Sequence, residues 1–178
     1  MNSSTYIPRL LTDKLRQSAA HYPVCTVIGP RQSGKTTLAR TVFPEKPYVS
    51  LEAPDVRNFA LEDPRGFLGQ FPEGAILDEF QRAPDLLSYI QTEVDELSQM
   101  GRYILTGSQH FLMMRDVSQS LAGRTSLHTL LPLSVEELQH HDFTFPETDD
   151  LLLKGGYPRI HAQGQPAFDL YRNYFATY

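Results

Sequence analysis

Short apolar runs alternate with amphipathic segments over the first 131 residues of the chain. The runs have the length and composition of buried strands and occupy residues 24–28, 48–51, 75–77, 103–105 and 126–131. Between them, apolar residues recur at helical spacing, most clearly over residues 85–98, where one stripe of the helix is apolar. Strands that alternate with helices predict an α/β fold with a parallel sheet covered on both faces.

Helical patterns also precede, interrupt and follow this alternation. We expect a helix over residues 9–21, short helices joined by turns over 52–73, and another helix over 109–121. Residues 132–178 read as helical, and their last helix carries an aromatic stripe at the spacing of a packing face. We therefore divide the chain into a core, residues 1–131, and a helical segment, residues 132–178. Because the stripe continues to the last residue, we expect the helical segment to lead into a second, truncated domain of a longer protein.

The first apolar run ends in a glycine-rich loop with a complete phosphate-binding pattern. Residues 29–36 match G-x-x-x-x-G-K-[ST] and lie between a predicted strand and a predicted helix, which is the context that this pattern requires. Backbone N–H groups of such a loop, with the positive end of the following helix, form a nest that fits a polyphosphate. Lys35 would place its charge between the β- and γ-phosphates, and the Thr36 hydroxyl would ligate Mg²⁺. The predicted nucleotide contacts are Gly29, Pro30, Arg31, Gln32, Ser33, Gly34, Lys35, Thr36 and Thr37.

Two acids follow the third apolar run. Asp78 and Glu79 come directly after residues 75–77, and adjacent side chains at the end of a strand point to opposite sides. Asp78 is expected to complete the Mg²⁺ site that Thr36 begins. Glu79 is expected to orient and deprotonate the attacking water. The alternative is a simple acidic turn that closes a core strand, but the phosphate-binding loop and the one intervening strand favour the catalytic interpretation.

A polar turn follows the fourth apolar run, and a side chain in it could hydrogen-bond the γ-phosphate or the attacking water and so act as a sensor. Ser108 is our candidate for this sensor, with Thr106 behind it, although Ser108 is equally suited to cap the helix that follows. Phosphoryl transfer also needs positive charge beyond the loop lysine, commonly an arginine from the same chain or from a neighbouring one. We favour Arg124, between a helix end and a strand, over Arg31 in the loop and Arg159 after a glycine turn. A solvated surface arginine is the alternative for each.

Composition and charge exclude several classes of protein. The chain has 178 residues, of which 21 are acidic and 16 basic, and a net charge of −5, so composition provides no argument for DNA binding. No apolar run reaches about eighteen residues and the first residues lack a secretory signal, so we expect a cytoplasmic protein with no membrane span. The single cysteine, Cys25, is interpreted as a core residue. His140, His141 and Asp142 are interpreted as a solvated loop, because no further ligand completes a metal site.

Five stretches of the sequence, taken in order, resemble the AAA_14 family of AAA+-like ATPases. They are residues 29–38, 77–81, 105–108, 120–124 and 155–158. The resemblance implies a P-loop NTPase fold with a five-stranded parallel sheet in the order 5-1-4-3-2, flanked by helices, and it implies ATP and Mg²⁺ as cofactors. It also implies that the final helix begins a C-terminal DUF4143 domain, which would be the effector domain of the full-length chain.

Three functions are compatible with these features. The leading hypothesis is an Mg²⁺-dependent ATPase whose conversion of ATP to ADP drives a conformational change in a larger protein. The alternative is a slow nucleotide-dependent switch that controls a fused effector or DNA-binding domain. A small-molecule kinase is the weaker third, because residues 52–73 supply only Arg57 and Arg65 for a second phosphate. No N-K-x-D sequence is present, so we do not expect a GTPase. Each hypothesis is compatible with a homo-oligomer.

Overall fold

Five parallel strands form the sheet that the sequence predicts. The computed structural model describes residues 6–108, 120–141, 143 and 148–177. The strands are β1 (Val24–Gly29), β2 (Tyr48–Ser50), β3 (Ile76–Asp78), β4 (Tyr103–Ser108) and β5 (Thr125–Thr129). Their order is β2-β3-β4-β1-β5, which confirms the predicted order 5-1-4-3-2. The strand that ends in the phosphate-binding loop therefore lies directly beside the strand that ends in the polar turn.

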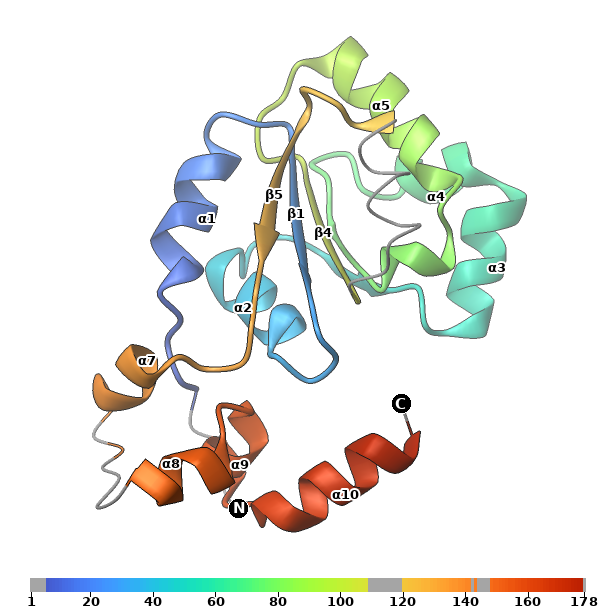
Figure 1. Ribbon diagram of the computed structural model, residues 1–178. Helices are drawn as coiled ribbons and strands as arrows, with labels where there is room; N and C mark the ends of the chain where they lie inside the picture. Colours follow the sequence, from blue (N-terminus) through green and yellow to red (C-terminus); the bar gives the residue numbers. More distant parts are fainter. Residues whose placement is uncertain (1–5, 109–119, 142, 144–147, 178) are drawn as a thin grey trace.

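Helices cover both faces of the sheet (Figure 1). The helices on one face are α1 (Leu11–Ala19) and α2 (Lys35–Val42), and those on the other are α3 (Pro54–Glu62), α4 (Pro64–Gly69) and α5 (Leu86–Leu97). Along β1, Cys25 and Val27 belong to the apolar cluster under α1 and α2, whereas Val24 and Ile28 belong to the cluster under α3, α4 and α5. Every residue of β1 is buried, as expected for a strand inside a doubly covered sheet. Cys25 is thus a core residue as predicted, and burial raises the pKa of its thiol.

The observed strand bounds differ most from the predicted ones at β4, which continues to Ser108 rather than ending at residue 105, and at the edge strand β5. β5 ends at Thr129 rather than at residue 131. Leu130 N–H still donates to the Ile28 carbonyl over 2.7 Å, but the Leu131 carbonyl accepts from Arg9 over 2.6 Å instead of from a strand. A side chain from the amino-terminal segment therefore ends the ladder. The helix predicted over 109–121 lies almost entirely outside the described residues.

The helical segment lies beyond the carboxyl ends of the strands (Figure 1). Its described helices are α7 (Val135–Gln139), α8 (Thr148–Lys154), α9 (Pro158–Gln163) and α10 (Ala167–Thr177). A capping box begins α7: the Ser134 hydroxyl accepts from Glu137 N–H over 3.1 Å, and the Glu137 carboxylate accepts from Ser134 N–H over 2.9 Å. The segment thus places α9 at the edge of the sheet where ligands bind in folds of this class.

Only part of the aromatic stripe on α10 packs within the described chain. The rings of Tyr171 and Tyr174 lie against Tyr157, with centroids 5.9 and 5.4 Å apart. Phe168 and Phe175 are 76% and 81% exposed. The tyrosines therefore fix α10 to the turn before α9, and the phenylalanines face solvent.

Candidate functional site

The phosphate-binding loop joins β1 to α2 through backbone that favours glycine. Gly34 has a φ of 95° immediately before α2, and Gln32, a residue with a side chain, has a φ of 63°. At Gly29 a β-carbon would lie 2.1 Å from the Leu130 carbonyl oxygen, so the loop leaves β1 in contact with the backbone after β5. The packing of β5 thereby fixes where the loop begins.

The Lys35 side chain turns back over this loop. Its ammonium donates to the carbonyls of Gly29 and Pro30 over 3.1 and 2.8 Å. Burial lowers the pKa of Lys35 because it removes water from the charged form, and the carboxylates of Glu79 and Asp78 oppose this effect. A buried cation whose two hydrogen bonds go to neutral carbonyls is well placed to bind an anion that enters the loop.

Asp78, at the end of β3, accepts hydrogen bonds from three hydroxyls. Thr36 Oγ1 lies 3.1 and 3.0 Å from its two oxygens, and Tyr48 Oη donates to Oδ2 over 2.8 Å. Thr106 Oγ1 donates to Oδ1. Burial and the neighbouring Asp78 carboxylate raise the pKa of Tyr48 to about 12, so the phenol keeps its proton and remains a donor. The structure thus brings Thr36 and Asp78 together as predicted, and it places the Thr106 hydroxyl on Asp78.

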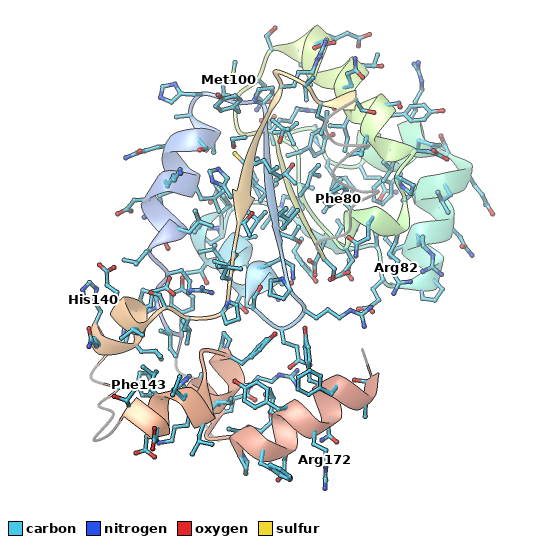
Figure 2. All side chains as sticks on the ribbon, viewed as in Figure 1. Phe80, Arg82, Met100, His140, Phe143 and Arg172 are labelled. Carbon is cyan, nitrogen blue, oxygen red and sulfur yellow. The ribbon has the colours of Figure 1, made fainter. Side chains whose placement is uncertain are left out.

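The Thr36–Asp78 pair fits Mg²⁺. Its donor set is a hydroxyl and a carboxylate, the oxygen ligands that this ion prefers, beside a loop shaped for phosphate oxygens. Elsewhere in the described ranges, no three His, Cys, Asp or Glu side chains gather as a metal site. His140 lies at the surface at the end of α7 (Figure 2), and Asp142 falls outside these ranges.

Among the described residues, no helix combines the length and the apolarity that a membrane span requires.

Glu79 follows Asp78 in a conformation that is uncommon for a residue with a side chain. Its φ is 56°, and it begins a short 3₁₀ turn, η1 (Phe80–Arg82). Phe80 anchors the turn in the core, where it is 3% exposed (Figure 2). The Glu79 carboxylate accepts a hydrogen bond from Gln81 Nε2 and lines the same cleft as Lys35 and Thr36. Strained backbone of this kind is concentrated at functional sites.

Ser108 lies at the end of β4, directly opposite Gly29 in the strand pairing. Its side chain is buried, and its hydroxyl has no hydrogen-bond partner among the residues that the structure describes. This position beside the loop suits the predicted sensor. The competing role, a cap for the following helix, concerns residues outside the described ranges.

The structure does not bring Arg124 to this site. Arg124 immediately precedes β5, and its carbonyl accepts from Val24 N–H at the first residue of β1. Its guanidinium donates to both oxygens of Asp95 over 2.6 and 2.8 Å. The residue therefore lies at the amino ends of the strands, whereas the phosphate-binding loop lies at their carboxyl ends. A contact between Arg124 and a γ-phosphate in its own chain is wrong, because the full length of the sheet separates the two.

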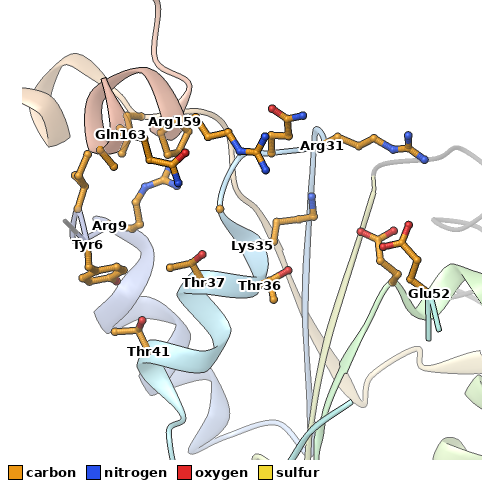
Figure 3. Close-up of a pocket in the computed structure, with 17 residues that line it drawn as sticks. Tyr6, Arg9, Arg31, Lys35, Thr36, Thr37, Thr41, Glu52, Arg159 and Gln163 are labelled. Atoms are coloured by element: carbon orange, nitrogen blue, oxygen red, sulfur yellow. The ribbon is translucent and has the colours of Figure 1, made fainter. Parts of the chain in front are cut away.

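A cleft of about 630 Å³ extends from the loop to the helical segment (Figure 3). Arg31 and Arg159 both line it, so the structure places two of the three candidate arginines at the site. In Figure 3 the Tyr6 side chain lies on one side of Lys35 and Glu52 on the other. Away from the loop the lining is mixed: the apolar residues are Tyr6, Ile7, Leu133, Pro158 and Ala162, and the polar ones include Arg9, Arg159 and Gln163. This volume is typical of a small-molecule site.

Arg9 is a buried residue of the site that no sequence pattern indicates. Its guanidinium donates to the Ser33 carbonyl in the loop over 2.8 Å, to the Leu131 carbonyl over 2.6 Å and to Glu137 Oε1 over 3.0 Å. Glu137 also accepts from Leu10 N–H over 2.8 Å. One arginine therefore joins the amino-terminal segment, the phosphate-binding loop and the helical segment.

Replacing Arg9 with Met is expected to lower the free energy of unfolding by about 3 kcal/mol, because it leaves the Glu137 carboxylate buried without its cation. Urea denaturation measures this loss. The matched control is Arg16→Met, which breaks an exposed ion pair with Asp13 and should cost under about 1 kcal/mol. Equal losses in the two variants would contradict the importance of the buried pair.

The stability that Glu137 provides should also depend on pH. Burial raises its pKa, but hydrogen bonds from Arg9, Ser134 and Leu10 outweigh this effect, and the net pKa is lowered. A carboxyl group with a lowered pKa stabilises the fold above its ordinary pKa. This contribution should therefore be lost as the pH falls through the lowered value.

Fold and loop together define a P-loop domain of the AAA ATPase type. The model of the family AAA_14, described as an AAA domain, matches residues 21–139, and the chain belongs to this family.

Curated relatives are longer than this chain. It is 35% identical over 146 residues to the uncharacterized protein Rv2008c of Mycobacterium tuberculosis and equally to Mb2031c of Mycobacterium bovis. The match covers 82% of this chain and 32% of each relative. The chain thus spans about a third of the length of these proteins.

Solved structures share the fold at low sequence identity. The Walker-type ATPase paby2304 of Pyrococcus abyssi has a TM-score of 0.59 at 18% identity. The match covers 92% of this chain and 71% of the ATPase chain. DnaA of Aquifex aeolicus, solved with AMPPCP, has a TM-score of 0.57 at 17% identity. The match covers 88% of this chain and 57% of the DnaA chain. A STAND protein of Pyrococcus horikoshii has a TM-score of 0.54 at 15% identity. The match covers 90% of this chain and 30% of the STAND protein.

Proposed function

We propose that the chain binds ATP with Mg²⁺ in this cleft and hydrolyses it to ADP and phosphate. The observation that carries the proposal is the contact of the Thr36 hydroxyl with Asp78, because it joins the phosphate-binding loop to the acidic strand where Mg²⁺ would be needed. Glu79 and Lys35 line the same cleft. The apolar side chains of Tyr6 and Ala162 in this lining suit a flat purine base.

Each residue has a defined task in this reaction. The loop amides and Lys35 bind the β- and γ-phosphates, and Ser108 donates to a γ-phosphate oxygen. Glu79 accepts a proton from water, whose oxygen attacks the γ-phosphorus while the bond from that phosphorus to the bridging oxygen of ADP breaks. Thr36 and Asp78 would hold Mg²⁺, whose positive charge would offset the negative charge of the phosphate oxygens.

Calorimetric titration with ATP tests the proposal. We expect binding with Mg²⁺ present and an affinity about tenfold or more weaker in excess EDTA, because the positive charge that Thr36 and Asp78 would hold beside the phosphates is then removed. Steady phosphate release should accompany binding in Mg²⁺. Absence of ATP binding in Mg²⁺, or equal affinity in EDTA, would contradict the assigned site.

Hydrolysis is proposed to act on a larger protein through the helical segment. Pro158, Arg159 and Ala162, at the start and within α9, line the cleft, so a bound nucleotide would touch this segment directly. A change from ATP to ADP would alter contacts with Arg159 and displace α9 relative to the sheet. A domain of the DUF4143 type, following α10, would receive that movement as the effector.

A slow switch is the second candidate function. The observation that favours it is the position of Arg124 away from the cleft, which leaves Arg31 and Arg159 as the candidates, because the third arginine of the cleft, Arg9, already donates to Glu137 and to two backbone carbonyls. A γ-phosphate contact from Arg124 would require a second copy of the chain. Turnover per chain that rises with protein concentration would support this assembly. A rate independent of concentration would favour an intrinsic activity set by one chain.

A further inference from the structure

Gln81 lies directly beside the proposed catalytic base. Its Nε2 donates to Glu79 Oε2 over 2.5 Å. The two residues are held in this relation by η1, since Glu79 begins the turn and Phe80 fixes it in the core. The amide thus engages one oxygen of the carboxylate and leaves Oε1 of Glu79 for another partner.

The other end of the Gln81 amide lies against the tip of β4. Its Oε1 is buried and accepts no hydrogen bond from any residue that the structure describes. A β-carbon on Gly107 would lie 2.4 Å from this oxygen, so the amide occupies space that exists because residue 107 is glycine. Gly107 lies between Thr106, which donates to Asp78, and Ser108, which faces the loop.

We propose that Gln81 is a positioning residue for Glu79, and that it sets the distance between the catalytic base and the polar turn of β4. The inference rests on the proposed function of Glu79 in hydrolysis. A glutamate at a surface cleft has several rotamers, and only those that place its free oxygen on the attacking water are productive. A hydrogen bond to one oxygen, from an amide that is itself packed against β4, selects among them.

Gln81→Met tests this inference because it keeps the length of the side chain and removes the donor. We expect turnover to fall by about tenfold to 100-fold, the range found when supporting residues are lost, with ATP affinity in calorimetry unchanged. The matched control is Gln99→Met, since Gln99 also donates to a glutamate, Glu73, over 3.2 Å, accepts from Arg102 over 2.6 Å, and does not line the cleft. The control should keep both its turnover and its ATP affinity.

A double-mutant cycle separates positioning from a general structural effect. In a Glu79→Gln background, measured in single turnovers, Gln81→Met should cause no further loss, because the residue acts only through the Glu79 carboxylate. Gly107→Ala, which would crowd both the Gln81 amide and the Phe80 ring that anchors the turn, should also lower turnover in the wild type.

Two outcomes would overturn the inference alone: full turnover of Gln81→Met, or the same fold-loss from Gln81→Met with and without the Glu79 carboxylate. A wild type whose turnover does not depend on Glu79 would overturn the proposed function and this inference together. Retained ATP affinity in Gln81→Met shows that a loss of turnover does not arise from unfolding.

Discussion

Replacing Glu79 with Gln is expected to lower ATP turnover by about 1000-fold while ATP affinity stays within about twofold. The amide has nearly the shape of the carboxylate but cannot accept the proton of the attacking water. Binding should persist because the contacts assigned to the phosphates come from the loop and Lys35. Phosphate release and calorimetric titration of the same preparation measure the two quantities.

Glu73→Gln is the matched control for this variant. Glu73 also accepts a hydrogen bond from a glutamine amide, that of Gln99, but it is exposed and does not line the cleft. Its substitution should leave turnover unchanged. Undiminished turnover in Glu79→Gln would remove this carboxylate from the reaction, and a parallel loss of ATP affinity would assign it to binding instead.

Replacing Lys35 with Ala is expected to weaken ATP binding by about 100-fold or more, since a buried ammonium hydrogen-bonded to phosphate is among the stronger polar contacts. Lys46→Ala provides a close control. The Lys46 ammonium also donates to two backbone carbonyls, those of Glu73 and Arg102, over 3.1 Å each. It does not line the cleft, so ATP affinity should be retained. Equal ATP affinity in wild type and Lys35→Ala would contradict the whole assigned site.

The lowered pKa of Lys35 adds a dependence on pH. The ammonium form binds phosphate, and burial lowers the pKa at which that form is lost in the free protein. ATP affinity should therefore decline with rising alkaline pH, earlier than for an exposed lysine. Calorimetric titrations at increasing pH measure this decline, and it should be absent in Lys35→Ala.

Sequence patterns predict those parts of the site in which neighbouring residues act together. The loop from Gly29 to Thr36 is one continuous pattern, and Asp78 with Glu79 follows a buried strand, so local sequence was sufficient to propose them as site residues. The sheet order then places Thr36 against Asp78 across 42 positions of sequence. This pair can be proposed from the sequence because Thr36 belongs to the phosphate-binding pattern and Asp78 to the acidic end of a predicted strand.

Residues that act through tertiary contacts carried no such signal. Tyr48 reaches Asp78 from the next strand, and Arg9 reaches the loop from a segment without a motif. The expectation for Arg124 was wrong for a different reason, which the sequence itself contained: a residue that directly precedes a strand of a parallel sheet lies at the amino ends of the strands. The aromatic spacing on α10 predicted a packing face. Which of its rings pack is decided by Tyr157, outside that helix, because Tyr157 contacts Tyr171 and Tyr174.

Arg9 also bears on how this protein should be divided for experiments. A recombinant piece cut at the limits of the family match, residues 21–139, would keep Glu137 and the Ser33 carbonyl but discard the guanidinium that serves both. The Glu137 carboxylate would then lose its cation, and the Ser33 carbonyl in the loop would lose its donor. Such a piece would also lack α1 with its buried Leu15, so it should be less stable than one that starts before Tyr6.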